Sequence, residues 1–558
     1  THDTFVLSSR FRHMSALLVA NALRIKRRNN TPAGETHMRH ETSRRRFLQS
    51  STAALGALAY GTNRRAEAQT NRPNVLLIMV DQWRADALGC AGHPTAQTPH
   101  LDVIAGGGTR FTQAYAAVPS CIAARAGFLT GQSQASHGFV GYRDGVNWRY
   151  EHTLPGTLSA GGYQTHCVGK MHVHPIRNRV GFDSVDLHNG YLHYARTGGI
   201  DAGRIDDYVP WLREQVGAGY VDYTDTGLGC NGYVATPWTL PERLHPTAWV
   251  TERSLDFLRR RDPTQPFFLM ASYHRPHPPL DPPIAYLDRY RDLPLPPIVE
   301  GDWVEHQLVP NSGLDSPVPH DAAQIDYARR AYFAQLTFID HQINRLSMAL
   351  QEEGVAGNTW IIFCSDHGEM LFDHKLIAKA QAFGASAGIP LIVRPPGGRF
   401  RGQAVPRTND RPVELRDIYP TLCQLAGLPI PPTVEGHSLL PLLEGSTAWP
   451  RPWLHGEHPA GDRSNHWLTD GVHRYVWYPT SGRELLFDLT IDPTETHNLA
   501  PSEADLLATW RGRLVDELRD RPEGYVANND LVAGRQILST LPWAGVGRAA
   551  AAAAENTG

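Results

Sequence analysis

The fold of this 558-residue chain is decided by the stretch Asn74-Val75-Leu76-Leu77-Ile78-Met79-Val80, which is followed at once by Asp81-Gln82. From Val75 to Val80 no polar residue interrupts the stretch. A half-buried strand would alternate apolar and polar residues, so an unbroken run of this length predicts a strand buried on both faces. Such strands occur in parallel sheets that helices cover on both sides.

Three similar runs recur further along the chain, at residues 165–168, 267–272 and 359–364. Helical patterns lie between them, and the clearest has apolar residues three and four apart over residues 325–350. The alternation predicts an α/β fold with a mostly parallel central sheet covered by helices on both faces. After about residue 451, shorter aromatic-rich runs and one last amphipathic helix predict a smaller C-terminal α+β domain.

The overall charge of −3 is the sum of two unlike parts. Residues 1–68 hold 12 Lys+Arg and 4 Asp+Glu, a net charge of +8, which leaves 41 against 52, or −11, for residues 69–558. Such a basic leader calls for an explanation separate from that of the fold. No basic stripe remains beyond it, so we expect no nucleic-acid partner.

The leader has the parts of an export signal in the right order. A short apolar run that extends to Tyr60 follows the segment Ser43-Arg44-Arg45-Arg46-Phe47-Leu48. A small-x-small cleavage site, Ala66-Glu67-Ala68, comes after this run. The paired arginines predict a twin-arginine signal over residues 38–68 and a periplasmic or secreted protein. Met38 offers a translation start that would leave residues 1–37 untranslated. The alternative is a basic amphipathic helix on a membrane surface.

The composition and length of the chain exclude several classes of protein. With 41% hydrophobic residues and 6 Cys, the chain is neither a disordered protein nor a disulfide-stapled small fold. No run reaches the roughly 20 apolar residues that cross a bilayer, so we expect no stable membrane anchor. We predict a catalytic domain over residues 69–450, a C-terminal α+β subdomain over 451–545 and a disordered tail over 546–558.

Polar groups follow the four predicted strands where each of them ends. In an open parallel sheet, ligands bind beyond the carboxyl ends of the strands, so these groups should meet at one edge. Each taken singly is more simply a cap or a satisfied polar residue, and the agreement of four strand ends favours a site. Carboxylates, an amide and one imidazole suit a divalent cation. The groups are Asp81, Gln82, Lys170, His172, His277, Asp366 and His367.

Cys121 is the candidate nucleophile. It follows the break Pro119-Ser120 and precedes small helix-forming residues, so we expect it at a helix N-terminus, where the dipole favours an anion. Arg125 lies four residues on and shares its helical face. The alternative is a buried structural cysteine, which is the reading we give to the other five.

These residues resemble the signature of the type I sulfatases. The pattern Cys121-x-Ala123-x-Arg125 is followed by Leu129-Thr130-Gly131, and Ser365-Asp366-His367-Gly368-Glu369 stands late in the chain, as in that family. The resemblance covers nearly the whole mature chain. It implies an alkaline-phosphatase-like fold and a sulfuric ester hydrolase of the arylsulfatase kind. It also implies that a dedicated maturase oxidises Cys121 to formylglycine.

The same resemblance implies a role for each candidate residue. One divalent cation, Ca²⁺ first and Mn²⁺ as the alternative, would be bound by Asp81, Gln82, Asp366, His367 and the modified Cys121. Around the sulfate oxygens and the leaving group would lie Arg125, Lys170, His172, His277 and Lys379. Implied partners are a small-molecule or saccharide sulfate ester, the maturase and the twin-arginine translocase. Many sulfatases have two acids where this chain has Asp81-Gln82, which leaves the identity of the metal open.

Two rival functions remain. A phosphonate monoester or phosphodiester hydrolase of the same superfamily shares the Asp-Gln and Asp-His pairs, but lacks the Gly-Lys-x-His element found here at residues 169–172. A catalytically silent binder of sulfated glycans would keep Cys121 as a thiol. The substrate itself is left open, and we expect its specificity to lie in residues 188–246, where Tyr191, Tyr194, Trp211 and Trp238 stand.

Overall fold

The computed structural model describes residues 72–190, 199–217, 228–304, 321–397 and 407–555. The predicted leader, and Tyr191 and Tyr194 in the predicted specificity segment, lie outside these residues. Contacts within the chain divide it into residues 1–69 and 70–558, and both sheets described below belong to the second unit. The predicted domain boundary near residue 450 stays a prediction.

The predicted first strand is β1 (Asn74–Asp81), and it lies in the middle of an eight-stranded sheet. All of its residues are buried, as the unbroken apolar run predicts. The strand order is β5-β4-β6-β1-β7-β8-β2-β9. Five neighbouring strands are parallel: β5 (Ser184–Leu187), β4 (Gln164–Gly169), β6 (Phe267–Pro276), β1 and β7 (Thr359–Ser365).

The other edge of this sheet is mixed. Strand β8 (Leu391–Arg394) runs antiparallel to both β7 and β2 (Thr109–Phe111), whereas β9 (Thr408–Asn409) is parallel to β2. The carboxyl ends of the five parallel strands still lie along one edge. The mostly parallel sheet that the sequence predicts is therefore confirmed.

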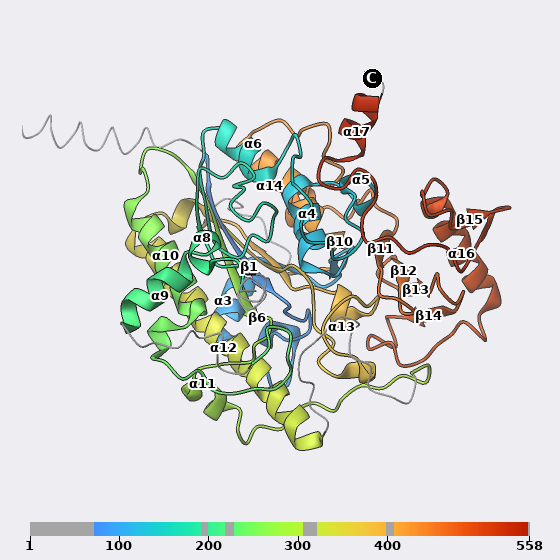
Figure 1. Ribbon diagram of the computed structural model, residues 1–558, viewed down its shortest axis with the longest axis horizontal. Coiled ribbons are helices and arrows are strands. Elements are labelled where there is room, and N and C mark those ends of the chain that lie inside the picture. The colour runs from blue at the N-terminus through green and yellow to red at the C-terminus, as the bar shows by residue number, and fades with distance from the viewer. Residues whose placement is uncertain (1–71, 191–198, 218–227, 305–320, 398–406, 556–558) are drawn as a thin grey trace, which may run out of the picture. The chain divides into compact units, whose positions relative to one another are not determined.

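Helices cover both faces, because alternate side chains of β1 enter two different cores. Leu76, Ile78 and Val80 belong to one core, together with α3 (Pro99–Gly106), α10 (Pro246–Arg260) and α12 (Ala322–Glu352). Val75, Leu77 and Met79 belong to the other, together with α4 (Cys121–Thr130), α6 (Leu154–Ala160) and α14 (Ile418–Ala426). In Figure 1 the second group of helices lies at the top of the view and the first group below it.

A second, antiparallel sheet follows near the C-terminus, as predicted. Its four strands are β11 (Leu454–His458), β12 (Asn465–Thr469), β13 (His473–Trp477) and β14 (Glu484–Asp488). One face packs on α16 (Ala504–Leu518) through Trp510 and Leu514. The other face packs through Trp467 on Tyr115 and Phe383 of the main body.

Two hydrogen bonds tie this second sheet to the segment around residue 380. The Asn465 amide donates to the carbonyl of Ala380 (3.0 Å), and the Arg474 guanidinium donates to that of Ala382 (2.6 Å). Asn465 and Arg474 are both buried. The second sheet therefore holds the backbone directly after Lys379.

The end of the chain differs from the prediction. Helix α17 (Arg548–Glu555) occupies most of the segment for which we expected a disordered tail. Its run of alanines, the best helix formers, accounts for the helix, and the Arg548 guanidinium lies 5.3 Å from the centre of the Trp543 ring. Across the part of the chain that the structure describes, no helix has both the length and the apolar character needed to cross a membrane.

Candidate active site

The first two site residues lie where β1 ends. Asp81 is the last residue of the strand and is completely buried. Gln82 then takes a positive φ of 73°, a conformation that non-glycine residues adopt rarely and mostly at functional sites. Its N–H donates to the Asp366 carboxylate (3.3 Å), so the ends of β1 and β7 meet.

Asp366 and His367 follow β7, and His367 faces both acids. Its Nε2 lies 3.3 Å from Asp81 and 3.7 Å from Asp366, while its Nδ1 donates to the carbonyl of Gly368 (2.9 Å). Burial and Asp81 raise the pKa of Asp366 to about 6. Burial alone would lower the pKa of His367, but Asp366 raises it to about 10. These two buried acids therefore draw positive charge to the Nε2 side of the ring.

Cys121 begins α4 and points its sulfur at the same acids. Its Sγ lies 3.6 Å from Asp81 Oδ1, 3.2 Å from His367 Nε2 and 3.3 Å from Lys379 Nζ. Burial and Asp81 would raise the pKa of this thiol, but Lys170, Lys379 and His367 hold it well below its usual range. Cys121 thus has the thiolate character of a reactive cysteine.

Other cysteines of the chain behave in the opposite way. Burial raises the pKa of Cys167 and that of Cys423 to about 12, because cationic groups do not offset the loss of solvation there. Their position in the core is the structural role that we expected. The contrast shows that the cationic groups around Cys121, rather than burial, set its chemistry.

Two lysines bring positive charge to the site. Lys170 follows β4, is completely buried and forms an ion pair with Asp81. Burial would raise the pKa of Asp81, but Lys170 holds it well below its usual range. Lys379 lies on an irregular segment and donates to the amide oxygen of Gln82 (2.9 Å). Both ammonium groups therefore lie beside proposed ligands of the cation.

The Arg125 side chain, on α4, forms hydrogen bonds to Asp366 and to residues in or directly after two strands of the main sheet. Its Nε donates to Asp366 (2.9 Å), and one terminal nitrogen donates to the carbonyl of Lys170 (2.6 Å) and the hydroxyl of Ser272 (3.1 Å). The other terminal nitrogen is buried and has no hydrogen-bond acceptor among the described residues. An anionic oxygen would satisfy this donor.

The two predicted histidines complete the group. The His277 N–H donates to the carbonyl of Asp81 (3.0 Å), and burial together with Lys379 lowers the pKa of its ring well below the usual range. His172 has a positive φ of 59°, its N–H donates to Asn189 (3.1 Å), and its side chain hydrogen-bonds to that of Cys121. Burial lowers the pKa of His172 too. All ten predicted site residues thus come together.

The donor atoms fit a divalent cation. One atom from each of Asp81, Cys121, Asp366 and His367 lies within 4.8 Å of the others, and all four residues are buried. The Gln82 amide oxygen faces the same place, since it accepts from Lys379 beside Cys121. Carboxylate, amide and imidazole donors suit Ca²⁺ and Mn²⁺.

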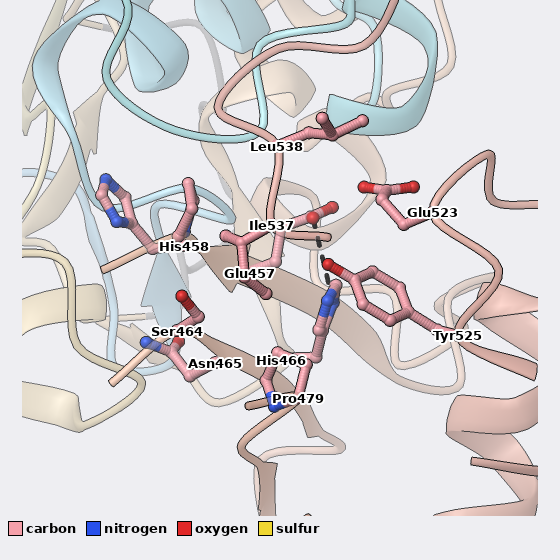
Figure 2. A pocket seen from close by; sticks show the side chains of 11 residues that line it. Glu457, His458, Ser464, Asn465, His466, Pro479, Glu523, Tyr525, Ile537 and Leu538 are labelled. Atoms are coloured by element: carbon pink, nitrogen blue, oxygen red, sulfur yellow. Dashed lines mark ion pairs between the residues drawn. The ribbon is translucent and has the colours of Figure 1, made fainter. Parts of the chain in front are cut away.

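A second cluster of possible ligands lies on the C-terminal sheet and needs no metal. His455 and His466 approach to 3.3 Å, and both oxygens of Glu457 accept from Arg521 (2.6 and 2.8 Å). Figure 2 shows the Glu457 carboxylate beside His466 in the pocket that they help to line. A histidine–histidine hydrogen bond and a bidentate ion pair already satisfy these groups.

Two further residues touch the site, and the sequence predicts no role for either of them. Glu369 and Tyr233 both contact the amide nitrogen of Gln82. Glu369 stands inside the quoted motif, three residues after Asp366, and this position was its only signal. Tyr233 lies in the predicted specificity segment, where nothing in the sequence marks it.

Fold and site together define a class of protein. A cysteine with thiolate character at a helix N-terminus, candidate cation ligands at the ends of parallel strands, and three cationic side chains form a site for hydrolysis of an anionic ester.

Known proteins narrow the class. Residues 73–428 match the family model described as Sulfatase. An arylsulfatase of Clostridium perfringens is 45% identical over 479 residues, which cover 84% of this chain and 99% of that protein. A multifunctional alkaline phosphatase superfamily protein of Trinickia caryophylli is 29% identical, with 82% and 99% covered. The phosphonate monoester hydrolase of Agrobacterium radiobacter has a similar fold, with a TM-score of 0.67, 24% identity, and 83% and 100% covered.

The chain belongs to the sulfatase family of the alkaline phosphatase superfamily. It is an enzyme, and its activity is the hydrolysis of sulfate esters.

The buried contacts of Arg125 predict a large loss of stability when they are removed. Arg125→Met leaves Asp366 without its guanidinium partner, and breaking a buried pair costs about 3–5 kcal/mol in the free energy of unfolding. The matched control is Arg177→Met, which removes a surface pair with Asp207 and should cost at most about 1 kcal/mol. Urea unfolding of metal-free protein measures both, and equal losses would contradict the prediction.

Proposed function

We propose that this enzyme hydrolyses sulfate monoesters with a formylglycine made from Cys121. We propose further that one divalent cation, Ca²⁺ before Mn²⁺, is held by Asp81, Gln82, Asp366 and His367. The observation that supports this most is the place of the Cys121 sulfur, within 4 Å of Asp81, His367 and Lys379. A nucleophile at this place lies in contact with both the candidate cation ligands and a cationic side chain.

Positive charge would act on the sulfuryl group as it is transferred. The cation, when bound, would polarise a sulfuryl oxygen and lower the pKa of the hydroxyl nucleophile. Arg125 offers its buried, unsatisfied terminal nitrogen to another oxygen, and Lys170 and Lys379 add two ammonium groups. Donors fixed before the reaction stabilise charge that develops in the transition state.

Proton transfers would then complete two steps. In the first, a neighbouring carboxylate takes the proton of one hydroxyl of the hydrated aldehyde at position 121, and that oxygen attacks sulfur. The bond from sulfur to the leaving oxygen breaks, and the leaving oxygen receives a proton from Lys379 or from the protonated form of His277. In the second, His172 takes the proton of the remaining hydroxyl, the aldehyde C=O forms again, and the bond from carbon to the sulfate oxygen breaks. Water hydrates the aldehyde, so the net reaction is ester plus water to alcohol plus sulfate.

Sulfate is the proposed preference over phosphonate. The Gly-Lys-x-His element, on which the sequence-based preference for a sulfatase rests, supplies the ion pair to Asp81 and the hydrogen bond to Cys121. The arylsulfatase relative is the more similar in sequence, and the likeness to the phosphonate hydrolase concerns the fold.

A comparison of two chromogenic esters tests this preference. We expect a higher kcat/KM for 4-nitrophenyl sulfate than for 4-nitrophenyl phenylphosphonate, since Lys170 and His172 are both in place. Each reaction releases the same nitrophenolate, so the assay has one readout. A faster phosphonate would assign the enzyme to the rival activity.

The role of Cys121 as the nucleophile can be tested by substitution and by mass spectrometry. Cys121→Ala should abolish turnover and leave the unfolding midpoint close to that of the parent, because it removes little buried volume. Peptide mass spectrometry of the parent, coexpressed with a maturase, should find the aldehyde at position 121. Turnover by Cys121→Ala would refute the role, and a thiol throughout the active parent would remove formylglycine from the mechanism.

We also propose that residues 38–68 direct export of the folded enzyme by the twin-arginine translocase, to a periplasmic or secreted location. The support is the order of its sequence elements, because the leader lies outside the described residues. Arg44→Lys combined with Arg45→Lys should leave the enzyme in the cytoplasm, as cell fractionation would show. Arg64→Lys combined with Arg65→Lys is the control and should export normally; equal export of both variants would contradict the assignment.

A further inference from the structure

Gln82 is held at both ends of its side-chain amide. The amide nitrogen donates to the Glu369 carboxylate and to the hydroxyl of Tyr233 (3.0 Å), whereas the amide oxygen accepts from Lys379 (2.9 Å). Gln82, Glu369 and Tyr233 are each about 1% exposed. Water therefore does not compete for these contacts.

The partners allow the amide one orientation. An ionised carboxylate only accepts hydrogen bonds, and an ammonium group only donates them. Exchange of the nitrogen and the oxygen of Gln82 would set oxygen against Glu369 and N–H groups against Lys379. The oxygen of Gln82 must therefore face the side of Lys379 and Cys121, where the cation ligands gather.

Glu369 is itself fixed. One of its oxygens accepts the N–H groups of Leu371 (2.7 Å) and Ala378 (2.8 Å), and the other accepts from Gln82 and Tyr233. The Tyr233 hydroxyl accepts from Gln82 and donates to Glu369, so both of its hydrogen-bonding roles are used. A fully satisfied buried network of this kind defines a single geometry.

We propose that Glu369 and Tyr233 are positioning residues that turn the oxygen of Gln82 toward the cation, and that position 82 carries an amide because Glu369 excludes a second carboxylate there. The first half of this inference rests on the proposed cation site. The second half does not, because it concerns only the contact between residues 82 and 369.

Glu369→Gln is the decisive substitution. Two backbone N–H groups still require an oxygen at the inner end of residue 369, so its new amide nitrogen must face Gln82. Donor then meets donor, and Gln82 turns over and presents its nitrogen to the cation. Loss of a ligand's supporting partner costs about 10–100-fold in metal affinity, and we expect a loss of that size for Ca²⁺ and, separately, Mn²⁺. Calorimetry on the full, metal-free chain measures it.

An exchange of the pair tests the excluded carboxylate. Gln82→Glu sets two carboxylates against each other and should lower the thermal unfolding midpoint of metal-free protein. Gln82→Glu combined with Glu369→Gln should restore it, because the amide at 369 then donates to the carboxylate at 82. The free oxygen at 82 faces Lys379 again, so Ca²⁺ affinity should also recover relative to Glu369→Gln alone.

Two tyrosines give a matched control. Tyr233→Phe removes a hydroxyl bound to the side chain of Gln82, whereas Tyr332→Phe removes one that donates to the main-chain carbonyl of Gln82 (2.9 Å). Both tyrosines are buried, and both variants should lower the unfolding midpoint. Only Tyr233→Phe should weaken Ca²⁺ binding, and equal affinities in the two variants would assign Tyr233 a structural role alone.

The remaining outcomes separate the two halves of the inference. Parental Ca²⁺ affinity in Glu369→Gln would overturn the positioning role. Parental stability in Gln82→Glu would overturn the exclusion of a second carboxylate. A parent that binds neither Ca²⁺ nor Mn²⁺ would overturn both the proposed cation site and the role of Glu369 toward it, while the stability series would still decide whether residues 82 and 369 are paired.

Discussion

The buried ion pair between Asp81 and Lys170 is the constraint on which the site depends. A carboxylate without solvent resists ionisation, and Lys170 keeps this one charged by holding its pKa low. The pair exists because β1 and β4 are parallel and end at the same edge, on either side of β6. If β7 ran antiparallel to its neighbour β1, Asp366 would lie at the opposite edge from Asp81. The parallel sheet thus decides where charge can be concentrated.

Much of this arrangement could be predicted from the sequence. Where a strand is buried on both faces, polar residues follow the apolar run, and this rule located Asp81 and, directly after Ser365, Asp366. It ended β6 at Ser272, although the strand runs on to Pro276, because Asp281 neutralises the buried Arg275 through two hydrogen bonds of 2.7 Å. The edge strands β2 and β9 have three and two residues, too few to show a period.

The positions of Lys379 and of the residues that bind the Gln82 side chain could not be predicted from the strand pattern. Lys379 lies between Ala378 and Ala380, which both have positive φ, so the segment follows neither helical nor strand periodicity. Only the resemblance to sulfatases pointed to it. Tyr233 meets Gln82 from 151 residues away along the chain, through the fold alone. With an amide at position 82, the acids Asp81 and Asp366 face four basic side chains, which are Arg125, Lys170, His367 and Lys379. That local excess of positive charge attracts a sulfate ester to a protein in which residues 69–558 together carry a net charge of −11.

The two hydrogen bonds from the C-terminal sheet to the carbonyls of Ala380 and Ala382 have an evolutionary consequence. Asn465 and Arg474 belong to the C-terminal sheet, yet they hold the backbone that directly follows Lys379. The C-terminal segment is therefore not an exchangeable accessory that recombination can swap freely among relatives. Any replacement must bring its own amide and guanidinium to the same two carbonyls.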